Sequence, residues 1–262
     1  AWGRVVQRNL PLFVGSVTLE DIGVLPSTPD SATLRLVQRL RGANRLPLLA
    51  RLNNRTAQRG AAESFAVALG ERLDRRTLGE LLDSARSGAR LYIEGAPLQD
   101  ENGRPLDNRI VALLGGEARP VNVRRETMTL DDPWFFGTAS GRRLAVEQRV
   151  TVVPRTLAED EAKGKKGEAP PTISVAARLA DGSPAVLVNP VGDGEVIWMP
   201  HRILDTSPLA PDETPIVTGA DETASATALF YAAVAGRIQP ALVQLENVEP
   251  APAPKEKTAA GT

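Results

Sequence analysis

The chain has 262 residues, 42% of them hydrophobic, which suffices for a substantial core in one large domain or two small ones. Its 31 basic and 32 acidic residues give a formal net charge of -1, so no overall field draws it to nucleic acid or an anionic membrane. Cysteine is absent, which excludes disulfides, thiolate metal ligands and a cysteine nucleophile. No apolar run approaches the roughly 20 residues that span a bilayer.

Residues 1–20 are interpreted as an incoming helix and linker. Apolar side chains recur at helical spacing between Trp2 and Leu10, and Pro11 ends the pattern. A short amphipathic helix followed by a long connection is typical of a chain that arrives from a preceding domain. We therefore expect its partner to be a preceding catalytic domain or another subunit.

From residue 21 onward, strand and helix patterns alternate. The clearest unit is 64–94, which combines an apolar strand, a helix with Asp74 as its N-cap and Gly88 at its end, and a second apolar strand. A crossover of this kind joins parallel strands. Together with its neighbours, the unit predicts an α/β sheet with strands at 21–26, 46–52, 64–69 and 90–94 and helices at 31–42 and 75–87.

After Gly95 the period of the pattern changes. A short helix is predicted at 108–114, and several short strands follow it, with Trp134 to Phe136 among them. Three further strands with tight turns at 181–183 and 192–194 are predicted in 172–200. We interpret 117–200 as an antiparallel β-rich extension. It is interrupted by a flexible loop at 157–171, where charge, Gly and Pro show no apolar period.

An Ala-rich helix at 223–235 and a strand at 241–245 end the pattern. Residues 247–262 form a Pro/Ala-rich tail, interpreted as a linker or a disordered terminus. The sequence therefore predicts one α/β domain over 21–246. Its sheet is expected to be flavodoxin-like and mostly parallel, with helices on both faces and the antiparallel β extension.

Three passages carry a resemblance to a known family: DIGVLPSTPD, LDRRTLGELLDSARSGARLYIEG and DGSPAVLVNPVGDGEVIWMPHRI. Their order resembles the class I glutamine-amidotransferase-like fold, in particular the post-barrel trimerisation domain of bacterial β-galactosidases and related glycoside hydrolases. The resemblance implies a noncatalytic accessory domain of a bacterial carbohydrate-active protein, which serves domain or subunit contact (oligomerisation) and shapes a sugar cleft. A glutaminase is excluded, because that chemistry needs a cysteine nucleophile.

Glu94 is the best single candidate for a functional carboxylate. It ends a predicted strand, and ligands of open α/β sheets bind outside the carboxyl ends of strands. Glycoside hydrolysis needs two carboxylates. An alternative reading is therefore a free-standing hydrolase that uses Glu94 with Asp100 or Asp132, and in either reading Glu94 and Asp100 are candidate ligand-binding residues. The competing interpretation makes Glu94 a capping residue and leaves the chain with no catalytic residue.

Other polar and aromatic clusters have both a binding and a structural interpretation. Asn53, Asn54 and Arg55 follow a predicted strand and suit sugar hydroxyls, or form a turn that caps its own backbone. Residues 131–136 could be a stacking platform, a protein contact or a core-anchoring turn. His201 is the only histidine, and a structural role beside Trp198 is favoured.

With one histidine and no cysteine, we predict no metal site and no cofactor. The basic run at 163–166 is offset by neighbouring acidic residues, so nucleic acid is not an expected partner, whereas carbohydrate is. A third hypothesis is a binding module of an envelope assembly, tethered by the tail. The compartment is left open between cytoplasm, periplasm and secretion.

Overall fold

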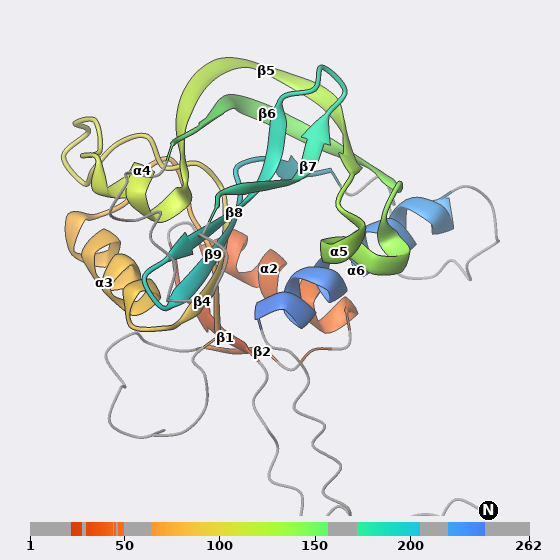
Figure 1. Cartoon of the computed structure of the whole chain (residues 1–262), viewed down its shortest axis with the longest axis horizontal. Coiled ribbons are helices and arrows are strands. Elements are labelled where there is room, and N and C mark those ends of the chain that lie inside the picture. The colour runs from red at the N-terminus through yellow and green to blue at the C-terminus, as the bar shows by residue number, and fades with distance from the viewer. Residues whose placement is uncertain are drawn as a thin grey trace, which may run out of the picture.

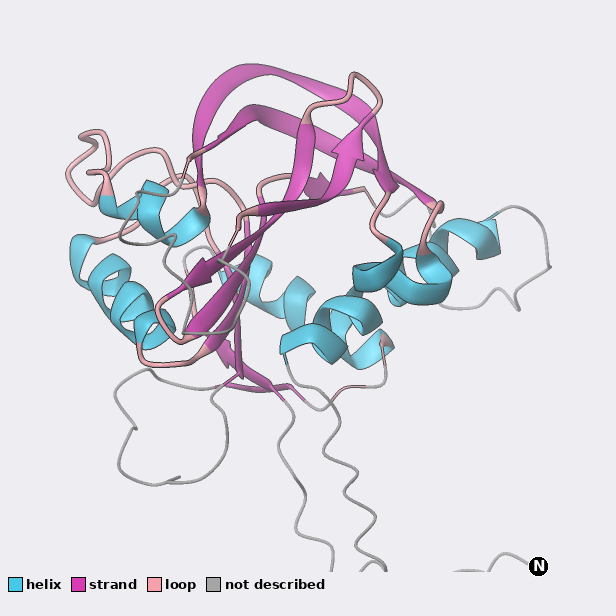
Figure 2. Ribbon diagram, in the orientation of Figure 1, coloured by secondary structure: helices cyan, strands magenta, loops and turns pink. Residues whose placement is uncertain are grey.

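The computed structural model of the chain describes residues 22–27, 30–43, 45, 47–49, 64–156, 172–204 and 220–238. The predicted leading helix, the loop at 157–171, the strand at 241–245 and the tail lie outside these residues. In chain order (Figures 1 and 2), the elements are β1 (Ile22–Leu25), α2 (Asp30–Gly42), β2 (Pro47–Leu49), β3 (Ser64–Ala68), α3 (Arg75–Arg86), β4 (Arg90–Glu94), α4 (Arg109–Leu114), β5 (Gly116–Leu130), α5 (Pro133–Phe136), the short helix η1 (Gly137–Ala139), β6 (Arg143–Pro154), β7 (Ser174–Leu179), β8 (Pro184–Val191), β9 (Gly194–Met199), β10 (Arg202–Ile203) and α6 (Ala220–Ile238).

The unit from β3 to β4 has the predicted structure. β3 and β4 pair in parallel, with Ser64 opposite Arg90 and Ala68 opposite Glu94. The intervening helix α3 is capped as expected, because the Thr77 backbone N–H donates to the Asp74 carboxylate at 2.7 Å. This segment places β4 inside the sheet, between β3 and β9.

The described strands form one sheet in the order β10-β6-β5-β7-β8-β9-β4-β3-β1-β2. The strands β2, β1, β3, β4 and β9 run parallel, and every pairing from β9 through β8 to β10 is antiparallel. The sheet is therefore parallel in one half only, and the prediction that it is mostly parallel is wrong. The β-rich extension is not appended to the sheet: β9 joins the parallel half while its neighbour β8 begins the antiparallel one.

The antiparallel half also differs from the several short strands that were predicted. β5 and β6 are 15 and 12 residues long and pair from Gly116↔Pro154 to Thr129↔Arg143, with a register shift between Pro120 and Arg124. Such a shift bends a strand. In Figure 1 the two strands arch over the rest of the sheet.

Helices cover both faces of the sheet, as predicted. Alternate residues of β4 divide between two cores: Leu91 and Ile93 pack with α3 and α4, whereas Tyr92 packs with α2 and α6. Glu94 has the same parity as Tyr92 and faces the α2 and α6 side. None of the described helices is both long and apolar enough to cross a lipid bilayer.

The segment Trp134 to Phe136, predicted as a strand, is instead the short helix α5. Asp132 accepts hydrogen bonds from the backbone N–H groups of Trp134 at 2.8 Å and Phe135 at 3.2 Å, and Pro133 occupies the first turn. This cap overrides the β preference of the aromatic residues. Phe136 stacks on Phe230 of α6 with ring centroids 5.9 Å apart, whereas Trp134 is 96% exposed.

Close packing of β9 against α3 generates a stability prediction. A Cβ atom on Gly194 would lie 2.2 Å from the Ala89 carbonyl oxygen and 2.3 Å from that of Ala85. Because both contacts are backbone atoms, Gly194→Ala should destabilise the fold by at least about 2 kcal/mol, measured by chemical denaturation. Gly79→Ala is the control, since it adds a methyl group to helix α3 without a clash and should stabilise by about 0.5–1 kcal/mol. Equal effects of the two substitutions would contradict this packing.

Candidate functional site

A cavity of about 470 Å³ opens at the carboxyl ends of β3, β4 and β9, and we call it the strand-end cavity. Residues 68–71, 94–96 and 200–202, which end or follow these strands, form its floor. Pro120, Val121 and Val123 of β5 line it from the other side, with residues 149–150 of β6. Parallel strands place their carboxyl ends at one edge, where ligands of open α/β sheets bind.

The backbone at this edge is held by hydrogen bonds that continue past the strands. The Leu69 N–H donates to the Glu94 carbonyl at 2.7 Å, and the Gly95 N–H donates to the Met199 carbonyl at 2.8 Å. Gly95 has φ +104°, and a Cβ there would lie 2.1 Å from the Leu69 carbonyl oxygen. The edge is therefore a rigid platform that requires glycine directly after Glu94.

Glu94 lines the strand-end cavity, as its position at the end of a strand predicted. Arg39 of α2 donates to Glu94 Oε1 at 3.0 Å, and the hydroxyls of Tyr92 and Tyr231 donate to Oε2 at 3.2 and 2.7 Å. Arg39 also donates to the Tyr231 hydroxyl at 2.8 Å and to the Ile203 carbonyl at 2.9 Å. One carboxylate thus joins β4, α2 and α6.

This polar network is largely buried. The Arg39 and Glu94 side chains are 8% and 14% exposed. Burial raises the pKa of Tyr92 and of Tyr231 well above the usual value, so both hydroxyls keep their protons and act as donors to Glu94. With one guanidinium and two hydroxyls directed at it, the Glu94 carboxylate is committed to the fold.

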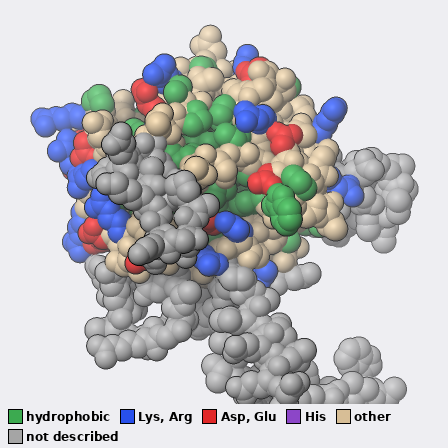
Figure 3. Space-filling model, in the orientation of Figure 1, with side chains coloured by type: hydrophobic (Ala, Val, Ile, Leu, Met, Phe, Trp, Pro, Cys, Tyr) green, Lys and Arg blue, Asp and Glu red, His purple; other side chains and the backbone are tan. Residues whose placement is uncertain are grey.

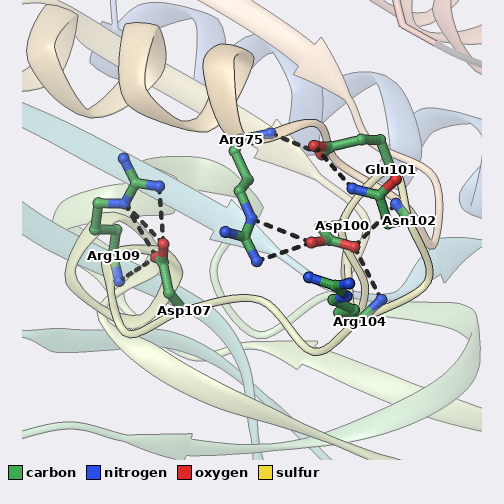
Figure 4. A network of polar contacts seen from close by, with 7 residues as sticks. All are labelled: Arg75, Asp100, Glu101, Asn102, Arg104, Asp107 and Arg109. Atoms are coloured by element: carbon green, nitrogen blue, oxygen red, sulfur yellow. Dashed lines mark hydrogen bonds and ion pairs between the residues drawn. The ribbon is translucent and has the colours of Figure 1, made fainter.

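Asp100 lies in a different environment from Glu94 and does not line the strand-end cavity. Its Oδ1 accepts from the backbone N–H groups of Asn102 and Arg104, both at 2.9 Å, and its Oδ2 accepts from Arg75 at 3.1 Å (Figure 4). The hydrogen bond from the Arg104 backbone, followed by those from Asn102 and Arg75, lowers the pKa of Asp100. These contacts close the loop after β4 against helix α3.

The remaining candidates are not assembled with Glu94 either. Asp132 caps helix α5 and does not line the strand-end cavity. Asn53, Asn54 and Arg55 lie outside the residues that the structure describes, so their sugar-binding role stays a prediction. Within the described ranges, no three His, Asp or Glu side chains come together as a metal site would require.

Four side chains that the sequence did not single out for this edge line the cavity: Arg35, Glu71, Arg149 and Arg202. Glu71 is paired with Arg149 at 3.4 Å. It follows β3 as Gly95 follows β4, so the argument from strand ends that selected Glu94 could also have found it. The arginines come from a helix, from β6 and from β10, and only the folded chain brings them together.

His201 also lines the cavity, and its side chain is almost completely buried, at 1% exposure. Neither Nδ1 nor Nε2 has a hydrogen-bond partner among the described residues. Burial lowers the pKa of His201 from 6.5 to about 4. The Pro184 carbonyl and the Asp181 carboxylate oppose that fall, but neither completes a hydrogen bond of normal geometry to the ring. The imidazole is therefore neutral at pH 7.

The sequence matches no protein-family model and no curated protein. The structure aligns with a β-galactosidase from Rahnella sp. R3 at a TM-score of 0.57 and 12% identity, over 90% of this chain and 33% of that chain. It aligns with Gan42B, a GH42 β-galactosidase from G. stearothermophilus, at a TM-score of 0.51 and 12% identity, over 76% of this chain and 30% of that chain.

These likenesses concern the fold alone, because the identities are so low. The chain spans about a third of the length of the β-galactosidases that it resembles. A GMP synthase protein from Thermoplasma acidophilum aligns at a TM-score of 0.49 and 9% identity, too weak a likeness to argue from. The fold expected from the β-galactosidase resemblance is thus supported.

The Glu94 network predicts a large loss of stability in Glu94→Gln. The substitution removes the counter-charge of the buried Arg39 and directs an amide at groups that already donate, so unfolding should become easier by about 3 kcal/mol in urea. The matched control is Glu80→Gln, which removes an exposed pair with Arg76 and should cost less than about 0.5 kcal/mol. A Glu94→Gln protein as stable as the wild type would mean that this carboxylate is not bound by the network.

The buried imidazole predicts a specific loss of stability in acid. Between pH 6.5 and about 4 the unfolded chain binds a proton at His201 that the folded chain does not, so stability falls as pH falls through this window. The loss should reach about 3 kcal/mol near pH 4 and be missing in His201→Gln, whose other titrating groups are unchanged. Denaturation at a series of pH values measures it, and superimposable profiles of the two proteins would refute it.

Proposed function

We propose that this chain is a noncatalytic accessory domain of a bacterial carbohydrate-active protein, a glycoside hydrolase such as a β-galactosidase. Its role there is to shape a sugar-binding cleft and to contact the catalytic domain or another subunit. The observation that carries the proposal is the alignment with the Rahnella enzyme, which takes in 90% of this chain but only 33% of that one. A unit of this proportion suits a part of such an enzyme.

The state of the carboxylates supports a noncatalytic role. Hydrolysis of a glycoside needs an acid and a base or nucleophile that face each other across the scissile bond. Glu94 is neutralised by Arg39, Asp100 closes its own loop and Asp132 caps α5. Each of the carboxylates considered for catalysis thus has a structural task.

Exposed apolar side chains support the role in protein contact. Trp134 is 96% exposed and Val123 is 62% exposed, so both apolar side chains are accessible to a partner surface. Figure 3 shows apolar side chains gathered on the face below the arch of β5 and β6 and again at α5. Trp134 is suited to such a contact, since aromatic anchors dominate many protein interfaces.

A second candidate is a free-standing hydrolase on this fold. Glu71 and Glu94 follow or end neighbouring strands and line the same cavity, so two carboxylates are present at one site, as glycoside hydrolysis requires. The ion pairs with Arg149 and Arg39 count against it. The third hypothesis, a tethered module of an envelope assembly, depends on the tail, and the tail lies outside the residues that the structure describes.

The chain itself should not hydrolyse 4-nitrophenyl β-galactoside, and light scattering should show self-association that Trp134→Ser weakens. The control for adventitious activity is the Glu71→Gln and Glu94→Gln double variant prepared in the same way. Turnover that this double variant loses while circular dichroism shows it to be folded would overturn the noncatalytic role in favour of the second candidate. Self-association that is unaffected by Trp134→Ser would remove α5 from the contact surface.

A further inference from the structure

The strand-end cavity has positive charge that the described residues do not neutralise. Both carboxylates among its described lining residues are already paired, Glu94 with Arg39 at 3.0 Å and Glu71 with Arg149 at 3.4 Å. Arg35 and Arg202 also line the cavity, and the side chain of neither makes a hydrogen bond or ion pair with any residue that the structure describes. Two arginine side chains thus line one cavity, and the described part of the chain gives them no acidic partner.

His201 lies beside the same cavity, where it is 1% exposed. Both of its ring nitrogens are buried, so the residue lines the cavity without offering a hydrogen bond to a molecule inside it. Its ring therefore serves as a reporter next to the site and not as a ligand-binding group.

The helix α2 adds to the preference for negative charge. Ala32 in its first turn and Arg35 one turn further along both line the cavity, so the amino-terminal end of this 13-residue helix lies beside it. The backbone N–H groups and dipole of a helix N-terminus favour anions. The end of helix α2 thus favours negative charge in the same cavity that Arg35 and Arg202 line.

The shape of the cavity favours an organic molecule over a bare ion. Val121, Val123 and Leu98 present apolar surface on its walls. Its volume of about 470 Å³ lies in the range of small-molecule sites. A neutral sugar would leave both guanidinium charges without a counter-ion, whereas the planar fork of arginine matches a carboxylate or a phosphate group.

We propose that the strand-end cavity binds a small organic anion through a carboxylate or phosphate group that Arg35 and Arg202 grip. The apolar body of the ligand lies against Val121 and Val123. This proposal does not depend on the accessory role, because the cavity and its charges belong to this chain alone.

The test uses three aromatic probes of similar size: benzoate, phenyl phosphate and the neutral benzamide. Because the chain has a single histidine, the ring resonances of His201 report binding by NMR without ambiguity, and calorimetry gives the affinity. At least one of the two anions should bind saturably and shift these resonances. Benzamide should bind at least about tenfold more weakly. The tighter of the two anions identifies the acidic group that the site prefers.

Two substitutions locate the binding. Arg35→Gln and Arg202→Gln should each weaken the binding of the anion by about tenfold. Arg143→Gln is the matched control, since Arg143 lines a different cavity and its loss changes the net charge equally. Circular dichroism checks the fold of each protein, and Arg35→Lys, which keeps the charge but loses the fork, replaces Arg35→Gln if that variant does not fold.

Three results would overturn the proposal. The first is benzamide binding as tightly as the anions, which would show that charge is not recognised. The second is an equal loss of affinity in Arg143→Gln and Arg35→Gln, which would show an effect of net charge alone. The third is the lack of saturable binding by both anions, with the His201 resonances unmoved.

Discussion

The ion pair between Arg39 and Glu94 links the chemistry of this protein to its architecture. It stands at the end of β4, a strand buried between β3 and β9, and it joins that strand to α2 and, through Tyr231, to α6. Because a buried charge requires a partner, the positions of both helices on this face are tied to one carboxylate. In this pair Arg39 binds the carboxylate of Glu94, which a hydrolytic site at this edge would need to be free.

Local signals in the sequence were sufficient for the unit from β3 to β4, because Asp74, Gly88 and two apolar runs act within a few residues of each other. They were insufficient for the antiparallel half. The length of β5 is set by its pairing with β6 and not by its own pattern, since residues 121–126 are exposed or half-buried. At Trp134 to Phe136 the cap from Asp132 outweighed aromatic β propensity, which is a weak preference.

The candidate site was predictable only where it depended on the end of a strand. Glu94 met that condition, but its partners Arg39 and Tyr231 are 55 and 137 residues away in the chain, so no sequence window contains them. Asp100 is close to Glu94 in sequence, yet its loop turns it towards Arg75. A structural role beside Trp198 was the expectation for His201 and stays a prediction, whereas its burial and its lack of hydrogen bonds to the described residues are properties of the folded surroundings.

The described residues neutralise the carboxylates of this strand edge and leave the side chains of Arg35 and Arg202 without an acidic partner, a balance of charge that favours the binding of an anion over hydrolysis. A double-mutant cycle on Arg39→Gln and Glu94→Gln, followed by urea unfolding, tests this claim most directly. The account predicts a coupling energy of at least about 2 kcal/mol between the two side chains. A coupling energy near zero would mean that Glu94 is free for other chemistry, and it would contradict the account.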